Sequence, residues 1–182
     1  MGIDSLTRVE KEAQKLLFRV GITTPAVNVE EIAKALELDV RRQRFDDDLS
    51  GVLVKVGQRA TVGINSRHSA QRQRFSLAHE IAHFWLGHPG DMFVDEAKGQ
   101  ATIVFRDGRS ADGTNLHEME ANRFAAALLM PADLLIESFA QCLADSLEDV
   151  EKEIVPRLAA EYDVSKQAMK IRLNSLGLAV AG

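Results

Sequence analysis

The sequence predicts an α+β fold in which a small antiparallel sheet packs with a buried helix and a second helix, both bearing candidate functional residues. Three observations support this prediction. Both ends of the chain show the apolar periodicity of α-helices, and the segment between them contains short runs rich in β-forming residues. Residues 75–86 form a largely apolar helical run that nevertheless contains two histidines and a glutamate. A chain of 182 residues that is 46% hydrophobic can bury a sizeable core.

The N-terminal part of the chain predicts two helices. Residues 4–20 are charged and amphipathic, and residues 28–36 (NVEEIAKAL) have the helical period. Asn28 is a suitable N-cap because Glu31 follows three residues later. The intervening TTPAVN segment is predicted to be a loop.

The sheet is predicted from segments in which the period changes. LDVRRQRF, SGVLVKV and RATVGIN are short and rich in β-forming residues, and the polar segments DDD and GQ separate them. Residues 92–106 contain two further β-forming pieces, MFVDEA and ATIVFRD. The Gly-, Ser- and Asp-rich residues 107–115 form a predicted loop before the next helix.

Residues 79–83 read HEIAH and carry the strongest functional signal in the chain. On a helix, side chains four residues apart share a face, so His79 and His83 can bind one metal ion together. Glu80 flanks that metal, where its carboxylate can take a proton from a water molecule and pass it to a leaving amine. Structural histidines are the alternative interpretation. A dication on a buried helix satisfies these polar groups more simply.

A hydrolytic zinc site requires a third protein ligand, and the predicted helix over residues 115–131 can supply it. Glu120 precedes Phe124 by four residues and Leu128 by eight, which predicts that it lies on the inward stripe. Glu118 is turned by about 200° from Glu120 and is expected to face solvent. We therefore expect His79, His83 and Glu120 to hold zinc.

Two other side chains are candidates near this site. His117 lies three residues before Glu120 and is the alternative third ligand. An oxyanion that develops during hydrolysis also requires a donor, which is often a tyrosine or histidine in zinc peptidases. His117 and Tyr162, the only tyrosine, are the candidates for this oxyanion or substrate contact.

The segment DDDLSGVLVKVGQRATVGINSRHSAQRQRFSLAHEIAHFWLGH, followed by EMEANRFAAALLMP, resembles the ImmA/IrrE family of zinc metallopeptidases. The resemblance extends from about Asn28 to Pro131 and is weaker beyond. It implies a compact α+β catalytic domain, zinc held by His79, His83 and Glu120, and Glu80 as the catalytic base. Members of the family are associated with cleavage of helix-turn-helix transcriptional repressors, in mobile elements, stress responses or toxin–antitoxin-like pairs. The implied partner is a DNA-binding repressor that serves as protein substrate.

One position departs from the pattern of related zinc enzymes. In thermolysin-like enzymes with a glutamate as third ligand, an aspartate one turn later usually orients a zinc-bound histidine. The residue one turn after Glu120 is Phe124. The histidines must then be oriented by a backbone carbonyl or by an acidic residue such as Asp91 or Asp107. His88 follows the predicted end of the helix and is expected to be a turn or surface histidine.

The sequence predicts a catalytic domain over residues 1–130 and a helical region over residues 131–182. Within the latter, residues 157–176 have the outline of a helix-turn-helix. The polar side chains that such a motif could present to DNA are Lys166, Gln167, Lys170 and Arg172. The helices could instead pack on the core through their apolar residues, and direct nucleic-acid binding is not expected because the chain has a net charge of −5.

Composition favours a cytoplasmic enzyme. The single cysteine, Cys142, cannot form an internal disulfide and suits a reducing compartment. The charged N-terminus has no apolar core of a signal peptide, and no apolar run approaches the length of a membrane span. We therefore expect no membrane association.

Two functions are consistent with these features. The first is a zinc-dependent endopeptidase that cleaves a partner protein. The second is a regulatory or toxin–antitoxin-type binding protein on a metallopeptidase fold, with or without DNA contact. The complete catalytic set favours the first function, because a binding module requires no base at Glu80.

Overall fold

The computed structural model describes residues 7–90, 92–96, 102–104, 114–145 and 150–178. These residues form a mixed α+β structure, as predicted, that divides into two compact units. One unit, here called the sheet unit, is Asn28–Ala125. The other, the helical unit, combines Met1–Val27 with Ala126–Gly182.

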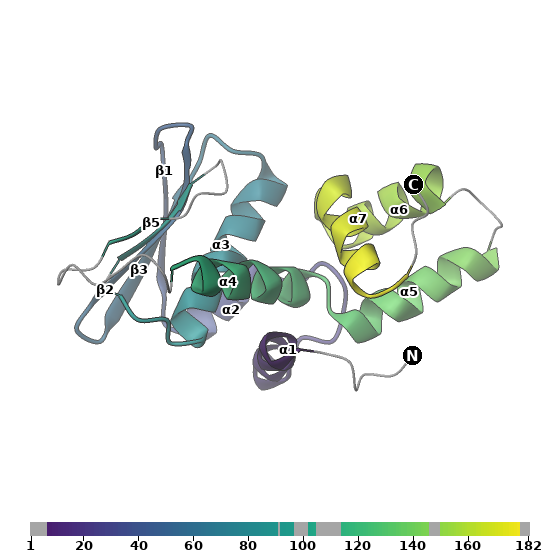
Figure 1. Ribbon diagram of the computed structural model, residues 1–182, viewed down its shortest axis with the longest axis horizontal. Helices are drawn as coiled ribbons and strands as arrows, with labels where there is room; N and C mark the ends of the chain where they lie inside the picture. Colours follow the sequence, from purple (N-terminus) through teal and green to yellow (C-terminus); the bar gives the residue numbers. More distant parts are fainter. Residues whose placement is uncertain (1–6, 91, 97–101, 105–113, 146–149, 179–182) are drawn as a thin grey trace. The chain divides into compact units, whose positions relative to one another are not determined.

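The sheet unit is built on five strands in the order β1-β3-β2-β4-β5. The strands are β1 (Asp39–Gln43), β2 (Leu49–Val56), β3 (Arg59–Asn65), β4 (Met92–Glu96) and β5 (Thr102–Val104) (Figure 1). All neighbouring pairs are antiparallel, as predicted, except that β1 pairs parallel with β3. Consecutive strands reverse direction here, and β1 adds beside β3 instead of β2, so it must run parallel to its neighbour.

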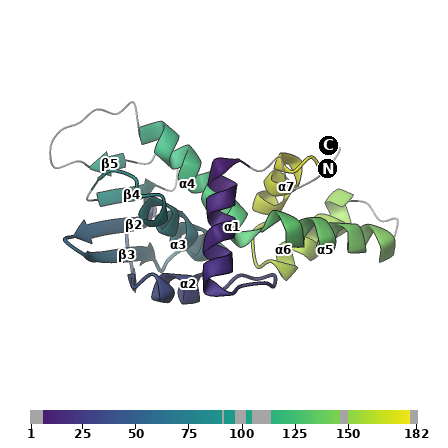
Figure 2. The same cartoon turned by 90° about the horizontal axis from the view of Figure 1, so that it is seen from below.

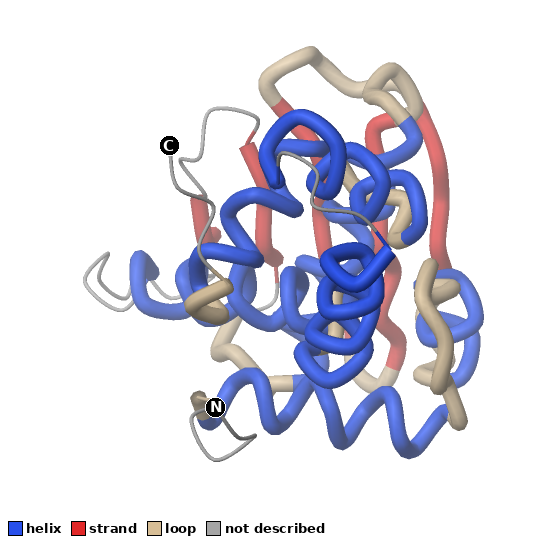
Figure 3. Tube along the Cα trace, turned by 90° about the vertical axis from the view of Figure 1, so that its right-hand side faces the viewer, coloured by secondary structure: helices blue, strands red, loops and turns tan. Residues whose placement is uncertain are grey.

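Helix α3 (Ala70–Trp85) carries the HEIAH motif and lies against the sheet, where it contacts β2, β3 and β4 (Figure 2). Strand side chains alternate between the two faces, and the inward set includes Leu53, Val62 and Ile64, all of them buried. The helix presents Leu77, Ala78, Ile81 and Ala82 as its buried apolar residues. Figure 3 shows the strands in red and the helices in blue. Burial of this apolar surface places the motif deep in the unit.

Two polar residues define the local chain path in the sheet unit. Asn28 caps α2 (Val29–Ala35) by accepting hydrogen bonds from two backbone amides, as predicted. Asn65, at the end of β3, is fully buried. Its amide nitrogen donates to the carbonyls of Asp46 and Leu49 at 3.0 and 2.7 Å, and its oxygen accepts from the backbone amides of Phe45 and Arg67. Asn65 therefore ties the β1–β2 connection to the segment that leads into α3.

The helical unit contains α1 (Arg8–Val20), the end of α4 (Thr114–Leu129), α5 (Ala132–Asp145), the π-helix η3 (Val150–Ile154), α6 (Val155–Glu161) and α7 (Lys166–Ser175). Helix α1 begins at a capping box formed by Thr7 and Glu10 and ends at Gly21, which has a positive φ of 72°. A backbone conformation of this kind favours glycine and commonly ends helices.

A buried ion pair joins the two ends of the chain within the helical unit. Arg172 of α7 pairs with Glu10 of α1 and also donates to the carbonyl of Met130. Burial raises the pKa of Glu10, but the hydrogen bonds with Arg172 and Thr7 outweigh it and hold the pKa below its usual value. Residues 7–27 thus group with the C-terminal helices, whereas the sequence-based division placed them in a catalytic domain over residues 1–130.

Helices α6 and α7 are joined by a short turn, and apolar side chains of both are packed inside the helical unit. Leu158, Val164, Met169 and Leu173 are buried. Arg172, one of the candidate DNA contacts, is buried in the ion pair with Glu10. Lys170 forms an ion pair with Glu151. Of the four candidate DNA contacts, Lys166 and Gln167 are exposed.

Tyr162 is fully buried at the end of α6, and its hydroxyl lies 3.1 Å from the Ser138 hydroxyl. Its ring therefore offers no surface to a substrate, contrary to the predicted role at the catalytic site. Burial raises the pKa of Tyr162 to about 12, although the Ser138 hydrogen bond acts in the opposite direction.

Among the described residues, no single helix is long and apolar enough to cross a membrane. The segments Leu116–Leu129 and Ala132–Ala144 reach that length and apolarity only as a pair, with a 53° bend at the break. Core helices of water-soluble proteins pass the same criterion, so the pair is weak evidence for a membrane span.

The buried tyrosine predicts a loss of stability at alkaline pH. In the unfolded chain a tyrosine ionises near pH 10, whereas Tyr162 in the folded chain resists ionisation up to about pH 12. Its raised pKa therefore contributes stability that is complete below pH 10 and is lost as the pH rises through 12, on the order of 2 kcal/mol. Denaturant unfolding of the wild type and of Tyr162→Phe between pH 8 and 12 should show this difference. Parallel pH profiles for the two proteins would contradict the assignment.

Candidate metal centre

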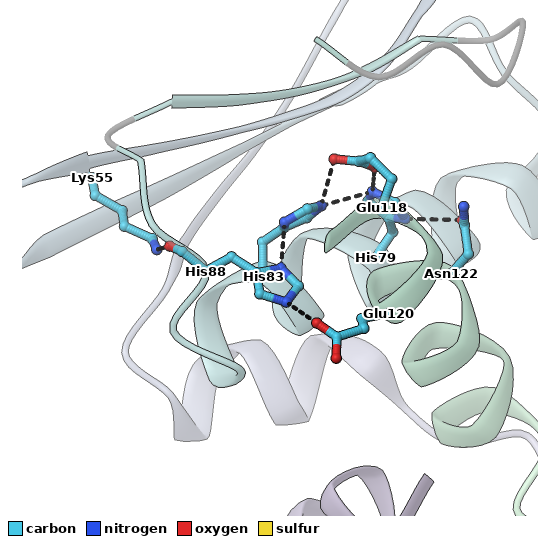
Figure 4. A network of polar contacts seen from close by, with 7 residues as sticks. All are labelled: Lys55, His79, His83, His88, Glu118, Glu120 and Asn122. Atoms are coloured by element: carbon cyan, nitrogen blue, oxygen red, sulfur yellow. Dashed lines mark hydrogen bonds and ion pairs between the residues drawn. The ribbon is translucent and has the colours of Figure 1, made fainter. Parts of the chain in front are cut away.

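Three charged or ionisable side chains of α3 are almost completely buried: His79, Glu80 and His83 are 2%, 0% and 0% exposed. The Nε2 atoms of the two histidines are 3.0 Å apart (Figure 4). This approach follows from their four-residue spacing, which stacks the imidazoles on one face of the helix. The predicted pairing of the two histidines is therefore present in the structure.

Glu118, from α4, is the carboxylate that meets both imidazoles. Its oxygens lie 3.0 Å from His79 Nε2 and 3.3 Å from His83 Nε2. One ligand atom from each of these three residues lies within 4.8 Å of the others. Glu120 instead contacts His88, at 3.3 Å. The sequence-based placement of these glutamates is thus corrected: Glu118, expected to face solvent, lies at the histidines, and Glu120 does not.

Both glutamates lie near the edges of the buried face of α4. Steps of four residues from Glu120 to Leu128 advance by about 40° beyond a full turn each time, so these residues do not form a straight stripe. The buried residues of α4 include Ala121, Phe124, Ala125 and Leu128, which span about 100° of rotation around the helix. Glu118 lies seven residues before Ala125, only about 20° away in rotation, and borders the buried face on that side, whereas Glu120 borders it on the side of Phe124.

The residues present fit a metal ion such as zinc. Two imidazole nitrogens and a carboxylate are a donor set typical of hydrolytic zinc sites. Ligands about 2.0–2.1 Å from a tetrahedral zinc ion lie roughly 3.3 Å from one another. The observed separations of 3.0 to 3.3 Å among His79, His83 and Glu118 are close to that value.

The protonation states of two of these residues also suit metal binding. Burial lowers the pKa of His83 to about 4, against the opposing effect of Glu118. Burial raises the pKa of Glu118, but its hydrogen bonds to His79 and His83 dominate and lower it to about 2. At neutral pH, therefore, His83 is uncharged and Glu118 is ionised. These are the forms in which histidine and glutamate bind metals.

The far nitrogen of His79 has a side-chain partner. Its Nδ1 lies 3.1 Å from Oδ1 of Asn122, which stands one turn after Glu118 on α4. The departure expected at Phe124 arose from counting one turn from Glu120. Counted from Glu118, the position that orients a histidine is occupied by an amide. The predicted alternatives, Asp91 and Asp107, lie outside the described residues.

The far nitrogen of His83 is 2.9 Å from Nδ1 of His88. His88 was predicted to be a turn or surface histidine, but it is buried. The helix ends at Trp85 with Leu86 as its C-cap, and Gly87 follows with a φ of 66°. The amide of His88 donates back to the carbonyl of His83. This glycine-terminated motif turns the chain back over the last helical turn. The Gly-His pair after the helix was the sequence signal for it.

Two further contacts surround the His88 ring and backbone. Its ring stacks on His117, with centroids 4.5 Å apart, and its carbonyl accepts a hydrogen bond from Lys55 Nζ at 3.1 Å. Burial lowers the pKa of His88 to about 3, and the neighbouring His83 and His117 act in the same direction. His117 therefore lies beside the cluster through His88 and is not the third member of the metal-binding group. Its Nδ1 is buried without a hydrogen-bond partner among the described residues.

Glu80 is placed against the sheet. A Cβ atom added to Gly51 of β2 would lie 2.9 Å from Glu80 Oε1 and 3.4 Å from its Cγ. Gly51 pairs with Ile64 on the inward face of the sheet. The missing side chain at Gly51 therefore leaves the space that the Glu80 carboxylate occupies.

A sequence-family profile for the IrrE N-terminal-like domain of peptidase family M78 matches residues 33–174. The match includes α3 and α4, and thus all three residues of the candidate metal centre. No curated protein matches the chain. The family match and the His-His-Glu cluster together support a metallopeptidase-type function. The chain belongs to the family of IrrE N-terminal-like domains, peptidase family M78.

Proposed function

We propose that this protein is a zinc-dependent endopeptidase whose metal ligands are His79, His83 and Glu118. The observation that carries the proposal is the cluster of His79, His83 and Glu118, in which both histidines are buried and Glu80 follows His79 on α3. A zinc ion held by these residues supplies a Lewis acid that polarises the substrate carbonyl and acidifies a water molecule. In this proposal Glu118 is the third ligand, in place of Glu120, which was expected from the sequence.

Glu80 is the proposed general base. It follows His79 directly, so its carboxylate flanks the face of α3 that carries the two imidazoles. In that position it accepts a proton from the attacking water and delivers it to the departing amine. Gly51 supports this role because its lack of a side chain lets the carboxylate rest on strand β2. His117, next to Glu118 in sequence and stacked on His88, remains the candidate donor to the substrate carbonyl oxygen.

We further propose that the substrate is a DNA-binding transcriptional repressor. The resemblance to the ImmA/IrrE family supports this class of substrate. A net charge of −5 is compatible with it, because a basic DNA-binding surface is attracted to an acidic partner. A regulatory binding protein that does not cleave is the second candidate, but it would not need a buried carboxylate at position 80.

Substitutions of the two neighbouring glutamates test the metal ligands. Glu118→Ala should lose most bound zinc, because it removes one of three ligands, whereas Glu120→Ala should retain one zinc per chain when zinc is in excess. Elemental analysis of the purified variants measures both. Circular dichroism of each variant controls for folding. Full zinc in Glu118→Ala together with loss of zinc in Glu120→Ala would restore the sequence-based assignment.

Substitution of the base tests the chemistry separately from metal binding. Glu80→Gln should keep zinc but reduce the cleavage rate by about 10²–10⁴-fold, the usual contribution of a general base. Gly51→Ala should also retain zinc and lower the rate, because the new methyl group displaces the Glu80 carboxylate. A wild-type rate for Glu80→Gln would show that Glu80 is not the base.

The substrate proposal is tested with the regulator encoded next to this gene. Zinc-loaded protein should cut that regulator at one site, and the Glu80→Gln variant should not. Mass spectrometry of the products identifies the cleaved bond. Tight binding without cleavage, or binding of this protein to the regulator's promoter DNA, would instead favour the regulatory alternative.

A further inference from the structure

A line of three polar side chains extends outward from the candidate metal centre on the side of His83. His83 Nδ1 lies 2.9 Å from His88 Nδ1, and His88 Nε2 lies 3.3 Å from Glu120 Oε2 (Figure 4). These residues come from α3, from the turn that follows it, and from α4. None of the contacts is needed to complete the His79–His83–Glu118 group, so the line requires its own explanation.

The hydrogen-bonding capacity of imidazole determines where the protons of this line lie. A neutral imidazole has one N–H donor and one nitrogen acceptor. If Nε2 of His83 binds a metal, its proton is on Nδ1, and His88 must accept that proton's hydrogen bond with its own Nδ1. The proton of His88 is then on Nε2, where the Glu120 carboxylate accepts it. Each donor in the line thus has an acceptor.

We propose that His88 and Glu120 are positioning residues that orient His83 as a metal ligand. Glu120 accepts a hydrogen bond from His88 Nε2 and so keeps the proton of His88 on that atom. The unprotonated Nδ1 of His88 then accepts a hydrogen bond from His83 Nδ1, which orients His83 with its Nε2 toward the metal. Metal-bound histidines commonly donate directly to a carboxylate or carbonyl. Here a second histidine stands between the ligand and the carboxylate. This inference rests on the metal site proposed above.

The surroundings of His88 support a fixed orientation for its ring. The backbone bond from its amide to the His83 carbonyl places it over the last turn of α3. His117 stacks on one side of the ring, and Lys55 binds its carbonyl. A ring held in this way can select one rotamer of His83. The two histidine ligands are therefore supported differently, since His79 has the neutral amide of Asn122 and His83 has a line that ends in a carboxylate.

Zinc affinity, measured by competition with a chromophoric chelator, tests the proposal without reference to peptidase activity. His88→Leu should weaken zinc binding by about 10–100-fold, the usual effect of losing a residue that orients a ligand. His88→Asn should recover part of the loss, because its amide oxygen can accept from His83 as Asn122 does from His79. Equal affinities for wild type and His88→Leu would overturn the proposal.

A double-mutant cycle tests whether Glu120 acts through His88. Glu120→Gln should weaken zinc binding in the wild-type background but have no further effect in His88→Leu. Fully additive losses of zinc affinity would show that the two residues act independently and would overturn the proposal that Glu120 acts through His88. Glu118→Ala distinguishes the two proposals. If this variant retains wild-type zinc affinity, the proposed metal site is wrong, and so is the proposed role of His88 and Glu120. If Glu118→Ala loses zinc while the His88 and Glu120 variants do not, only the proposed positioning role of His88 and Glu120 is wrong.

Nitrogen NMR of the imidazole rings gives a second readout that a merely structural role would not predict. In the zinc-loaded protein, His88 should carry its proton on Nε2 and His83 on Nδ1. Glu120→Gln should shift the His88 Nε2 signal while leaving His79 unchanged, which makes His79 the internal control. A His88 ring protonated on Nδ1 would contradict the proposed direction of the hydrogen bonds.

Discussion

The structure of the sheet unit depends on one constraint: the polar side chains buried on α3 must be satisfied. An unpaired imidazole or carboxylate in an apolar interior costs several kcal/mol, on the order of 2–7 even for neutral groups. His79, Glu80 and His83 are all nearly inaccessible to solvent. For the two histidines, α4 supplies Glu118 and Asn122, and the turn after α3 supplies His88.

The sheet contributes by positioning α3 rather than by supplying ligands. Alternate side chains of β2 and β3 point inward, and the apolar ones among them are buried beneath α3. Asn65 joins the β1–β2 connection to the segment that leads into this helix. At Gly51 the alternation has a gap that the Glu80 carboxylate fills. A side chain there would be in contact with the proposed base. The absence of a side chain at Gly51 therefore serves both the packing of the core and the placement of the proposed base.

In the helical unit, residues that could have served in recognition are used for stability. Arg172, which the helix-turn-helix outline offers to DNA, is buried against Glu10, and the hydroxyl of Tyr162 bonds Ser138. The contact between Glu10 and Arg172 joins positions 162 residues apart and includes α1 in this unit. A buried ion pair of this kind contributes little net stability, but removal of one partner is strongly destabilising because it leaves a lone buried charge.

Local features of the sequence determined much of this protein. The spacing of His79 and His83, the cap at Asn28 and the strand segments follow from backbone geometry and near-neighbour chemistry, which need no tertiary information. Tertiary structure decided between Glu118 and Glu120, which lie two residues apart on one helix. That choice depends on the rotation of α4 about its axis, which is set by the packing of its buried residues, among them Ala121, Phe124 and Ala125. The same holds for the grouping of α1 with the C-terminal helices, because contacts between distant segments carry no local signal in the sequence.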